Sequence, residues 1–238
     1  MLSSNLTDAL LSPILSVDAA GPRITYYDDA TGERIELSAL TLANWAAKTA
    51  NMLRDEFGLT PGDKVAVSLP AHWQTAAVLL GVWWAGGEVL LDLSDVDDAA
   101  VALVTVDHLE SVDSVDEIAV LSLDPFGRPV PDLPIGVTDY ATTVRVHGDQ
   151  FQTAGAGPVF DGLDADAVLE QAQAAARELG LSAADRVLAT APWDTTEHLV
   201  QNFLAILAAG ASLVHVANPD ADAQTRRVTS EKITRQLP

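Results

Sequence analysis

Apolar residues recur along this chain in blocks that are typical of helices alternating with short buried strands. Within 39–57 the apolar residues recur at helical spacing, and 64–69 form a short apolar run. A second helical block follows over 71–85, and a second apolar run over 88–93. The breaks between these blocks fall at Gly58, Pro61, Gly62, Pro70, Gly86 and Gly87. The pattern predicts helix, turn, strand, helix and strand from 39 to 92.

The segment 164–219 repeats this order. It reads as a helix over 165–179, a strand over 187–191, a helix that ends at 209 and a strand over 211–216. Four residue pairs match at one constant offset: Gly58 with Gly180, Asp63 with Asp185, Val65 with Val187 and Pro70 with Pro192. Helices placed between buried strands favour parallel pairing through right-handed crossovers. We therefore predict an α/β fold of two pseudo-symmetric subdomains, one over 1–150 and one over 151–238.

The remaining segments are less regular. Strands are expected over 99–106, 117–123 and 140–146, and 124–135 reads as a proline-rich loop. The tail, 220–238, is polar, and we interpret it as a short helix followed by a strand.

Composition narrows the function. The chain has 238 residues, 48% of them apolar, no cysteine and a formal net charge of −21. The absence of cysteine excludes a disulfide framework and a thiolate site, and the negative charge disfavours binding to nucleic acid or to an anionic membrane. Asp8 and Asp18 interrupt the first twenty residues, so a secretory signal is not expected. We expect a cytoplasmic protein.

The repeat resembles the opening half of adenylate-forming enzymes, the superfamily of acyl-CoA synthetases and AMP-binding enzymes. The resemblance rests on 59–65 (Leu-Thr-Pro-Gly-Asp-Lys-Val), 181–188 (Leu-Ser-Ala-Ala-Asp-Arg-Val-Leu) and 208–214 (Ala-Ala-Gly-Ala-Ser-Leu-Val), and covers about three quarters of the chain. These are structural signatures of the N-terminal subdomains and not catalytic motifs. The chain is most similar to a group of short proteins that look like truncated relatives of these enzymes.

The resemblance implies a phosphate-binding loop just before the second repeat. Family members hold ATP there with serines, threonines and glycines that end in Pro-Lys-Gly, which supply backbone N–H groups, hydroxyls and a cation. The corresponding residues, 152–162, read Gln-Thr-Ala-Gly-Ala-Gly-Pro-Val-Phe-Asp-Gly. Thr153, Gly155 and Gly157 are the candidate ligand-binding residues that remain, Asp161 would repel phosphate, and an ordinary glycine-rich loop is the alternative.

Trp193 and His198 are the other candidate ligand-binding residues. They follow Pro192 near the start of a helix, where open α/β sheets bind ligands, and the family lines its acyl pocket near this position. His198 is a candidate acid/base group in a pair with Asp194 or Glu197. The alternative is a helix N-cap formed by Asp194 or Thr195, without a role in binding.

Several family motifs are missing from the sequence, among them the magnesium-binding glutamate segment, the ribose-binding aspartate and the C-terminal domain with its catalytic lysine. We therefore predict no catalytic residue, no metal site and a non-catalytic binding or regulatory protein. The alternatives are a ligase subunit that a partner chain completes and a structural protein that dimerises. We expect a homo-oligomer or a protein partner, no resident cofactor, and a small acyl or nucleotide ligand, with ATP, AMP and CoA as the ones to test.

Overall fold

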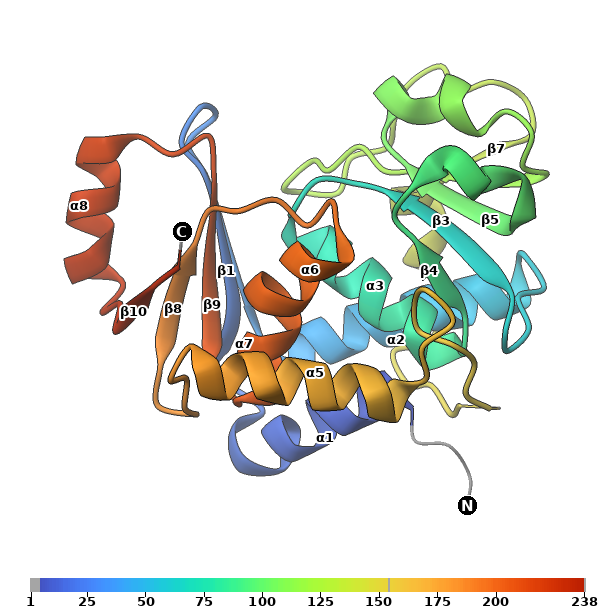
Figure 1. Cartoon of the computed structure of the whole chain (residues 1–238). Helices are drawn as coiled ribbons and strands as arrows, with labels where there is room; N and C mark the ends of the chain where they lie inside the picture. The colour runs from blue at the N-terminus through green and yellow to red at the C-terminus, as the bar shows by residue number, and fades with distance from the viewer. Residues whose placement is uncertain (1–4, 154, 238) are drawn as a thin grey trace.

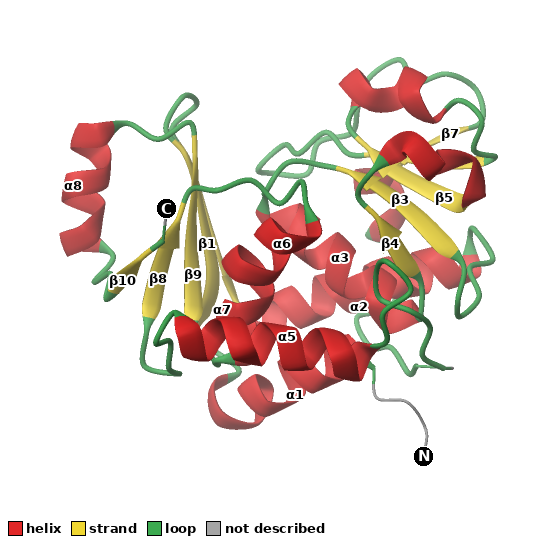
Figure 2. Ribbon diagram, in the orientation of Figure 1, coloured by secondary structure: helices red, strands yellow, loops and turns green. Residues whose placement is uncertain are grey.

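Two five-stranded sheets stand on either side of a layer of helices (Figure 1). The computed structural model describes residues 5–153 and 155–237. The predicted α/β class, with mostly parallel strands, is confirmed. One further helix lies on the outer face of the first sheet, away from the central layer (Figure 2).

Sheet A joins strands from both ends of the chain. Its spatial order is β10 (Arg235–Gln236), β8 (Arg186–Ala189), β9 (Ser212–Ala217), β1 (Pro22–Asp28) and β2 (Glu33–Ser38). The strands pair in parallel except for β1 and β2, which form an antiparallel hairpin. Because β1 and β2 lie in this sheet, the predicted boundary at 150 does not coincide with the division between the two sheets.

Sheet B is parallel throughout. Its order is β4 (Glu88–Leu90), β3 (Lys64–Ser68), β5 (Ala99–Val104), β6 (Glu117–Val120) and β7 (Val137–Asp139). The strands are short apolar runs, as expected for parallel strands that are covered on both faces. All of them carry their carboxyl ends to one edge of the sheet.

The helical segments follow the predicted order, with additions that the sequence pattern did not reveal. They are α1 (Leu6–Asp18), α2 (Ala39–Asp55), α3 (Trp73–Ala85), α4 (Tyr140–Val144), α5 (Ala165–Glu178), α6 (Thr196–Leu199), α7 (Ala205–Ala208), α8 (Ala221–Ser230), and the 3₁₀ segments η1 (Leu93–Asp98) and η2 (Val106–Val112). A π-helical turn, η3 (Val200–Leu204), joins α6 to α7.

The two repeat units share one turn. Asp63 Oδ2 accepts hydrogen bonds from the backbone N–H and the hydroxyl of Thr60, both at 2.8 Å, and Asp185 Oδ2 accepts the same pair from Ser182 at 2.8 and 2.7 Å. The carbonyl of each aspartate then accepts the N–H of the first residue of the next parallel strand, Glu88 or Ser212. At both matched aspartates, the same turn leads the chain into a parallel strand, which confirms the pseudo-symmetry.

Residues 140–146 do not form the predicted strand. Asp139 ends β7, and its Oδ1 accepts the N–H of Thr142 at 2.7 Å, so the chain turns into α4. Tyr140 and Val144 lie one helical turn apart, and both are buried. The alternation of apolar and polar residues in this segment fits a strand equally well. The N-cap formed by Asp139 stabilises the helix instead.

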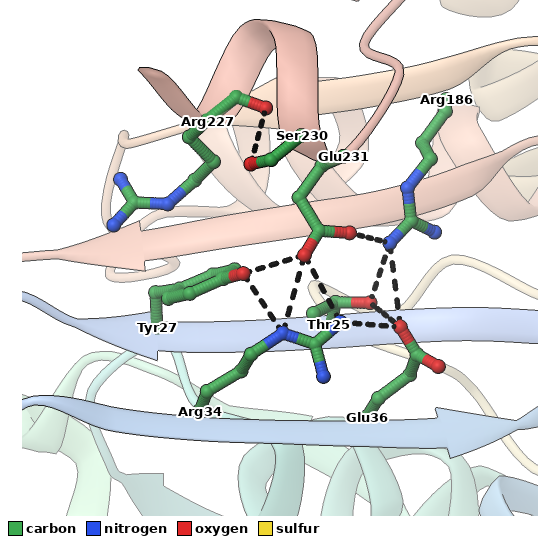
Figure 3. Close-up of polar contacts among 8 residues, drawn as sticks. All are labelled: Thr25, Tyr27, Arg34, Glu36, Arg186, Arg227, Ser230 and Glu231. Atoms are coloured by element: carbon green, nitrogen blue, oxygen red, sulfur yellow. Dashed lines mark hydrogen bonds and ion pairs between the residues drawn. The ribbon is translucent and has the colours of Figure 1, made fainter. Parts of the chain in front are cut away.

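The outer face of sheet A carries a polar cluster under the end of α8 (Figure 3). The Glu231 carboxylate accepts hydrogen bonds from Tyr27, Arg34 and Arg186. Although burial raises the pKa of Glu231, these bonds hold it at about 2. The cluster fastens the tail, whose predicted helix and strand are both present, to the sheet.

Within the described part of the chain, no helix combines the length and the apolar character that crossing a membrane requires.

Candidate functional site

A cleft opens between the two sheets at the carboxyl ends of β3, β5 and β6. We call it the inter-sheet cleft; its volume is about 740 Å³. Its lining is Val67, Ser68, Leu69, Pro70, Leu91, Thr105, Val106, Asp107, His108, Leu121, Ser122, Leu123, Pro129, Val130, Pro131, Trp193 and Asp194. Ligands of open α/β folds bind at the carboxyl ends of parallel strands, because the loops that follow the strands diverge there.

The lining of the inter-sheet cleft is mostly apolar. Its described residues include no lysine or arginine, and its formal charges are those of Asp107 and Asp194. Polar contacts come from hydroxyls and from His108, whose Nδ1 lies 2.7 Å from Ser68 Oγ. Such a lining suits an apolar body and offers no counter-charge to a polyphosphate.

The structure places Trp193 at this cleft. The side chain is 2% exposed, and its ring lies 4.7 Å from that of Phe203 and 5.4 Å from that of His215, centroid to centroid. Its Nε1 is buried and has no hydrogen-bond partner among the described residues. A buried indole N–H usually has a partner, and this donor is an exception.

His198 stands beside the cleft and not within its lining. Its Nδ1 lies 2.8 Å from Oδ1 of Asp194, which does line the cleft, and its side chain is 42% exposed. Of the two predicted partners, Asp194 makes the contact, whereas Glu197 accepts from Gln201. Thr195 caps the helix through the N–H of His198. The helix cap by Thr195 and the His198–Asp194 pair are thus both present at the start of α6.

The candidate loop lies elsewhere. Thr153 donates to the carbonyl of Gly155 at 2.6 Å, and Gly157 packs its backbone against Gly62 and Gly86. These contacts lie at the amino end of β3, across the sheet from the cleft. A Cβ on Gly157 would stand 2.2 Å from the carbonyl oxygen of Gly86, and the cavity that borders Gly157 has no room for a water molecule. Ala154, the third residue of this loop region, lies outside the described residues.

The five predicted site residues therefore separate into two groups. Trp193 and His198 come together through Asp194, and Thr153, Gly155 and Gly157 lie at the opposite edge of sheet B. At Gly157, the close backbone approach accounts for the glycine without a ligand.

A second pocket lies next to the cleft and shares Pro70 and Leu123 with it. We call it the hairpin pocket; its volume is about 900 Å³. Its lining is Tyr26, Asp28, Thr31, Gly32, Glu33, Arg34, Ile35, Pro70, Ala71, His72, Leu123, Pro125, Phe126, Ala217 and Asn218. The β1–β2 hairpin supplies the greater part of its polar side.

His72 lies at the inner end of the hairpin pocket and begins α3. Its Nδ1 accepts the N–H of Gln74 at 3.1 Å, and its Nε2 lies 3.5 Å from Oε1 of Glu33. The ring of Tyr26 meets that of His72 edge to face at 4.3 Å. Burial lowers the pKa of His72 although Glu33 opposes this, and burial together with the charge of His72 lowers the pKa of His215 to about 4.

The partners of His72 were not predicted from the sequence. Glu33 and Tyr26 come from strands that pair around a Thr31-Gly32 turn, and alternation along the hairpin puts both on the face toward α3. The turn between two alternating segments was the available signal. No cluster of three or more His, Asp or Glu side chains suited to a metal ion occurs among the described residues.

Comparisons with known proteins agree with this fold. No protein-family model matches the chain. A protein of Mycobacterium tuberculosis (strain ATCC 25618 / H37Rv), named "TIGR03089 family protein", is 58% identical over 242 residues, which cover 98% of each chain.

Solved ligases share the fold at low identity. The anthranilate CoA ligase AuaEII, in complex with anthranoyl-AMP, is 17% identical with a TM-score of 0.78, over 99% of this chain and 50% of that one. A Brucella canis acyl-CoA synthetase is 16% identical with a TM-score of 0.81, over 98% of this chain and 47% of that one. A benzoate CoA ligase from Burkholderia xenovorans LB400 is 17% identical with a TM-score of 0.75, over 98% of this chain and 50% of that one. The chain thus spans about half the length of these ligases, and the predicted resemblance to the N-terminal part of adenylate-forming enzymes is confirmed for the fold.

Proposed function

Since the chain belongs to the TIGR03089 family and has the fold of the N-terminal part of an adenylate-forming enzyme, we propose that it is a non-catalytic binding protein. Its ligand is a small molecule whose apolar body, an acyl chain or an aromatic ring, enters the inter-sheet cleft. The observation that carries this proposal is the cleft itself, with an apolar lining at the carboxyl ends of parallel strands and Trp193 as one wall.

The charges at the cleft support a ligand without phosphate. Asp107 and Asp194 would repel a triphosphate, and the described lining holds no lysine or arginine to offset them. Acyl adenylation develops negative charge on phosphate and carboxylate oxygens, and its catalysis depends on donors and cations aimed at that charge. The close packing of Gly157 on Gly62 and Gly86 likewise leaves no cradle at that point of the loop. Phosphate binding by Thr153, Gly155 and Gly157 stays a prediction.

A thermal-shift titration tests the proposal. Medium-chain acyl amides and aromatic amides are titrated beside ATP–Mg²⁺, AMP and CoA at fixed salt, because a ligand that binds only the folded state raises the Tm with concentration. We expect a dose-dependent rise with the amides and none with ATP–Mg²⁺ or AMP. A rise with ATP–Mg²⁺ or AMP alone would contradict the proposal and favour the ligase subunit that a partner chain completes.

Two matched variants locate the binding. Val106 lines the cleft and is 50% exposed, and Val146 is 80% exposed and lies outside the lining. We expect Val106→Trp to fill the cleft and weaken amide binding about 10-fold or more, which is a loss of roughly 1.4 kcal/mol. Val146→Trp adds the same surface and leaves binding unchanged. Equal affinity in the two variants would place the ligand elsewhere, and absence of any ligand would leave dimerisation, read from the molar mass in solution, as the leading role.

A further inference from the structure

The hairpin pocket holds acidic groups without a matching cation. Asp28 and Glu33 both line it, and Tyr26 lines it from the same face of the hairpin. Hydrogen bonds from Asn218 and from the N–H of Ala30 outweigh the burial of Asp28 and keep its pKa below the usual value, so the group is charged at neutral pH. Burial, followed by the charges of Asp28 and Glu33, raises the pKa of Tyr26. The phenol therefore stays neutral in a region of negative potential.

Arg34 lines the same pocket, but its guanidinium is bound on the opposite face of sheet A. Figure 3 shows it among the polar cluster under α8, where Nη2 lies 2.9 Å from Glu36 and 3.0 Å from Glu231, and Nε donates to Tyr27 at 2.8 Å and to Glu231 at 3.2 Å. Successive residues of a strand point to opposite faces, so Glu33 and Arg34 are separated by the sheet. The positive charge nearest in sequence to Glu33 is thus already paired.

Polar atoms at the inner end of the pocket are left unsatisfied. Glu33 Oε1 and His72 Nε2 are both buried with no hydrogen bond in the described structure, at 3.5 Å from one another. His72 is 2% exposed, and because its Nδ1 already accepts from Gln74, the neutral ring carries its proton on Nε2. The His72 Nε2–H is thus one donor facing the Glu33 carboxylate, which can accept several hydrogen bonds. Buried carboxylates normally accept more hydrogen bonds than this, so the inner end of the pocket lacks donors.

The mouth of the pocket is apolar. Phe126, Pro125, Leu123 and Ile35 line it; Phe126 is 73% exposed, and the Arg128 guanidinium lies 5.9 Å from the centroid of its ring. Exposed aromatic faces attract cations and pack against apolar groups. The pocket therefore combines an acceptor-rich inner end with an apolar entrance.

We propose that the hairpin pocket binds a small organic cation, a primary ammonium on an aromatic or aliphatic body, with the ammonium donating to Glu33 and its body against Phe126. An ammonium supplies three donors and a positive charge, which match the carboxylates and the phenol oxygen of Tyr26. The strongly acidic chain, with a formal net charge of −21, favours the approach of a cation over that of an anion. This site is separate from the inter-sheet cleft, and its test does not depend on the ligand of the cleft.

The test compares three probes of one shape: 2-phenylethylamine, the neutral 2-phenylethanol and the anionic 3-phenylpropanoate. Titration calorimetry is carried out in the Val106→Trp background, in which the cleft is filled. We expect the amine to bind about 10-fold or more tightly than the alcohol, as one charge-assisted hydrogen bond implies, and the acid to bind most weakly. Raising the salt concentration lowers the affinity for the amine alone.

Glu33→Gln keeps the shape of the side chain and removes its charge. We expect it to lower the affinity for the amine about 10-fold and to leave that for the alcohol unchanged. Asp107→Asn, which removes a carboxylate from the neighbouring cleft, is the matched control and leaves both unchanged. An amine that binds no more tightly than the alcohol, or an equal loss in the two variants, would overturn the proposal.

A surface variant keeps the test open if Glu33→Gln fails to fold. Phe126 is exposed, so Phe126→Ala does not disturb the core, and we expect it to weaken binding of the amine about threefold through lost ring contact. Val146→Ala, at another exposed apolar position, is its control. Equal affinities in these two variants would remove Phe126 from the site and count against the proposed binding mode.

Discussion

The two repeat units share a framework and differ where their second helix begins. In both units an aspartate caps a Thr or Ser turn and sends the chain into a parallel strand. In the first unit, His72 begins α3 and is 2% exposed, whereas in the second unit Thr195 begins α6 and the nearby His198 side chain is 42% exposed. The turns set the position of the strands, and the helix starts give each unit a different pocket.

The second helices also pack differently. In the first unit α3 is unbroken, and Gly81 lets it approach α2 so closely that a Cβ there would lie 2.6 Å from Cβ of Thr49. In the second unit the helix is interrupted by the π-helical turn η3, which carries Phe203 against the ring of Trp193. π-helical turns often occur at functional sites. Here the turn supports the indole that forms a wall of the cleft.

Removing the ring that supports Trp193 should have the largest effect on stability. Phe203 is 1% exposed, so we expect Phe203→Ala to lower the free energy of unfolding by about 3–5 kcal/mol, from lost burial and the cavity that remains. Urea unfolding followed by tryptophan fluorescence and by far-ultraviolet circular dichroism measures the loss. Phe203→Leu retains most of the volume and serves as the control. A loss below about 1 kcal/mol for the alanine variant would show that Trp193 does not depend on this contact.

The buried histidines should make the fold sensitive to acid. His215 packs against Tyr26, His72 and Trp193, with Glu33 and Asp28 beyond His72, and burial lowers its pKa to about 4. The unfolded chain takes up the proton near pH 6.5, so it binds more protons than the folded chain below that pH. Stability is therefore greatest above about pH 6.5 and falls as the pH drops towards 4, by roughly 3 kcal/mol for this one group.

The pH dependence of stability tests the role of His215. Denaturant unfolding at half-unit steps from pH 7 to 5.5 gives the slope before carboxylates with lowered folded pKa values, such as Glu231, begin to take up protons in the unfolded chain. We expect His215→Gln to flatten the slope, whatever its effect on stability at pH 7. A slope that is the same in wild type and His215→Gln would contradict the role assigned to His215.

Local chemistry allowed much of the framework to be predicted from the sequence. The turns at Asp63 and Asp185 can be predicted because each aspartate accepts a hydrogen bond from a residue only three positions away. The end of α3 can be predicted from Gly86, whose positive φ glycine tolerates. The β1–β2 hairpin was missed although its turn was a local signal. The pairing of β1 with β9 was missed because β1 meets a strand almost two hundred residues later in the chain. Parallel pairing over such a distance leaves no local pattern to detect.

The site was predictable only in part, for the same reason. Trp193 and Asp194 follow a strand end, which is a position that sequence can locate, and their place at the cleft agrees with it. The approach of Glu33 to His72 depends on the hairpin folding over the start of α3, and neither residue carries a signal of the other. The close packing that requires Gly157 was likewise hidden, because its neighbours Gly62 and Gly86 come from distant turns.

The close contact of α3 with α2 should tolerate little added volume. A methyl group at Gly81 would meet Thr49 and the carbonyl of Ala46, at 2.6 and 2.9 Å. We expect Gly81→Ala to lower the free energy of unfolding by about 1–3 kcal/mol, because overpacking outweighs the gain in helix propensity. The double variant Gly81→Ala/Thr49→Ser removes the Thr49 methyl, which would lie at 2.8 Å, and should recover part of the loss. No recovery would mean that the remaining clashes, with Cβ of Thr49 and with the carbonyl of Ala46, dominate.

The shared turn itself offers the finest comparison. Among the described residues, the Asp63 side chain accepts hydrogen bonds from Thr60 alone, whereas the Asp185 side chain also accepts from the hydroxyl of Thr234 at 2.7 Å, next to β10. Hydrogen bonds from Ser182 and then Thr234 lower the pKa of Asp185.

We expect Asp63→Asn and Asp185→Asn each to destabilise the fold, with Asp185→Asn the more costly by about 1 kcal/mol, the net value of one hydrogen bond. Thr234→Val in combination with each asparagine variant completes a double-mutant cycle, measured by urea unfolding. Coupling is expected with Asp185 and not with Asp63. If both cycles gave the same coupling, the tail strand would be held by the outer-face cluster around Glu231 and not by the turn, and the two units would be equivalent at this turn.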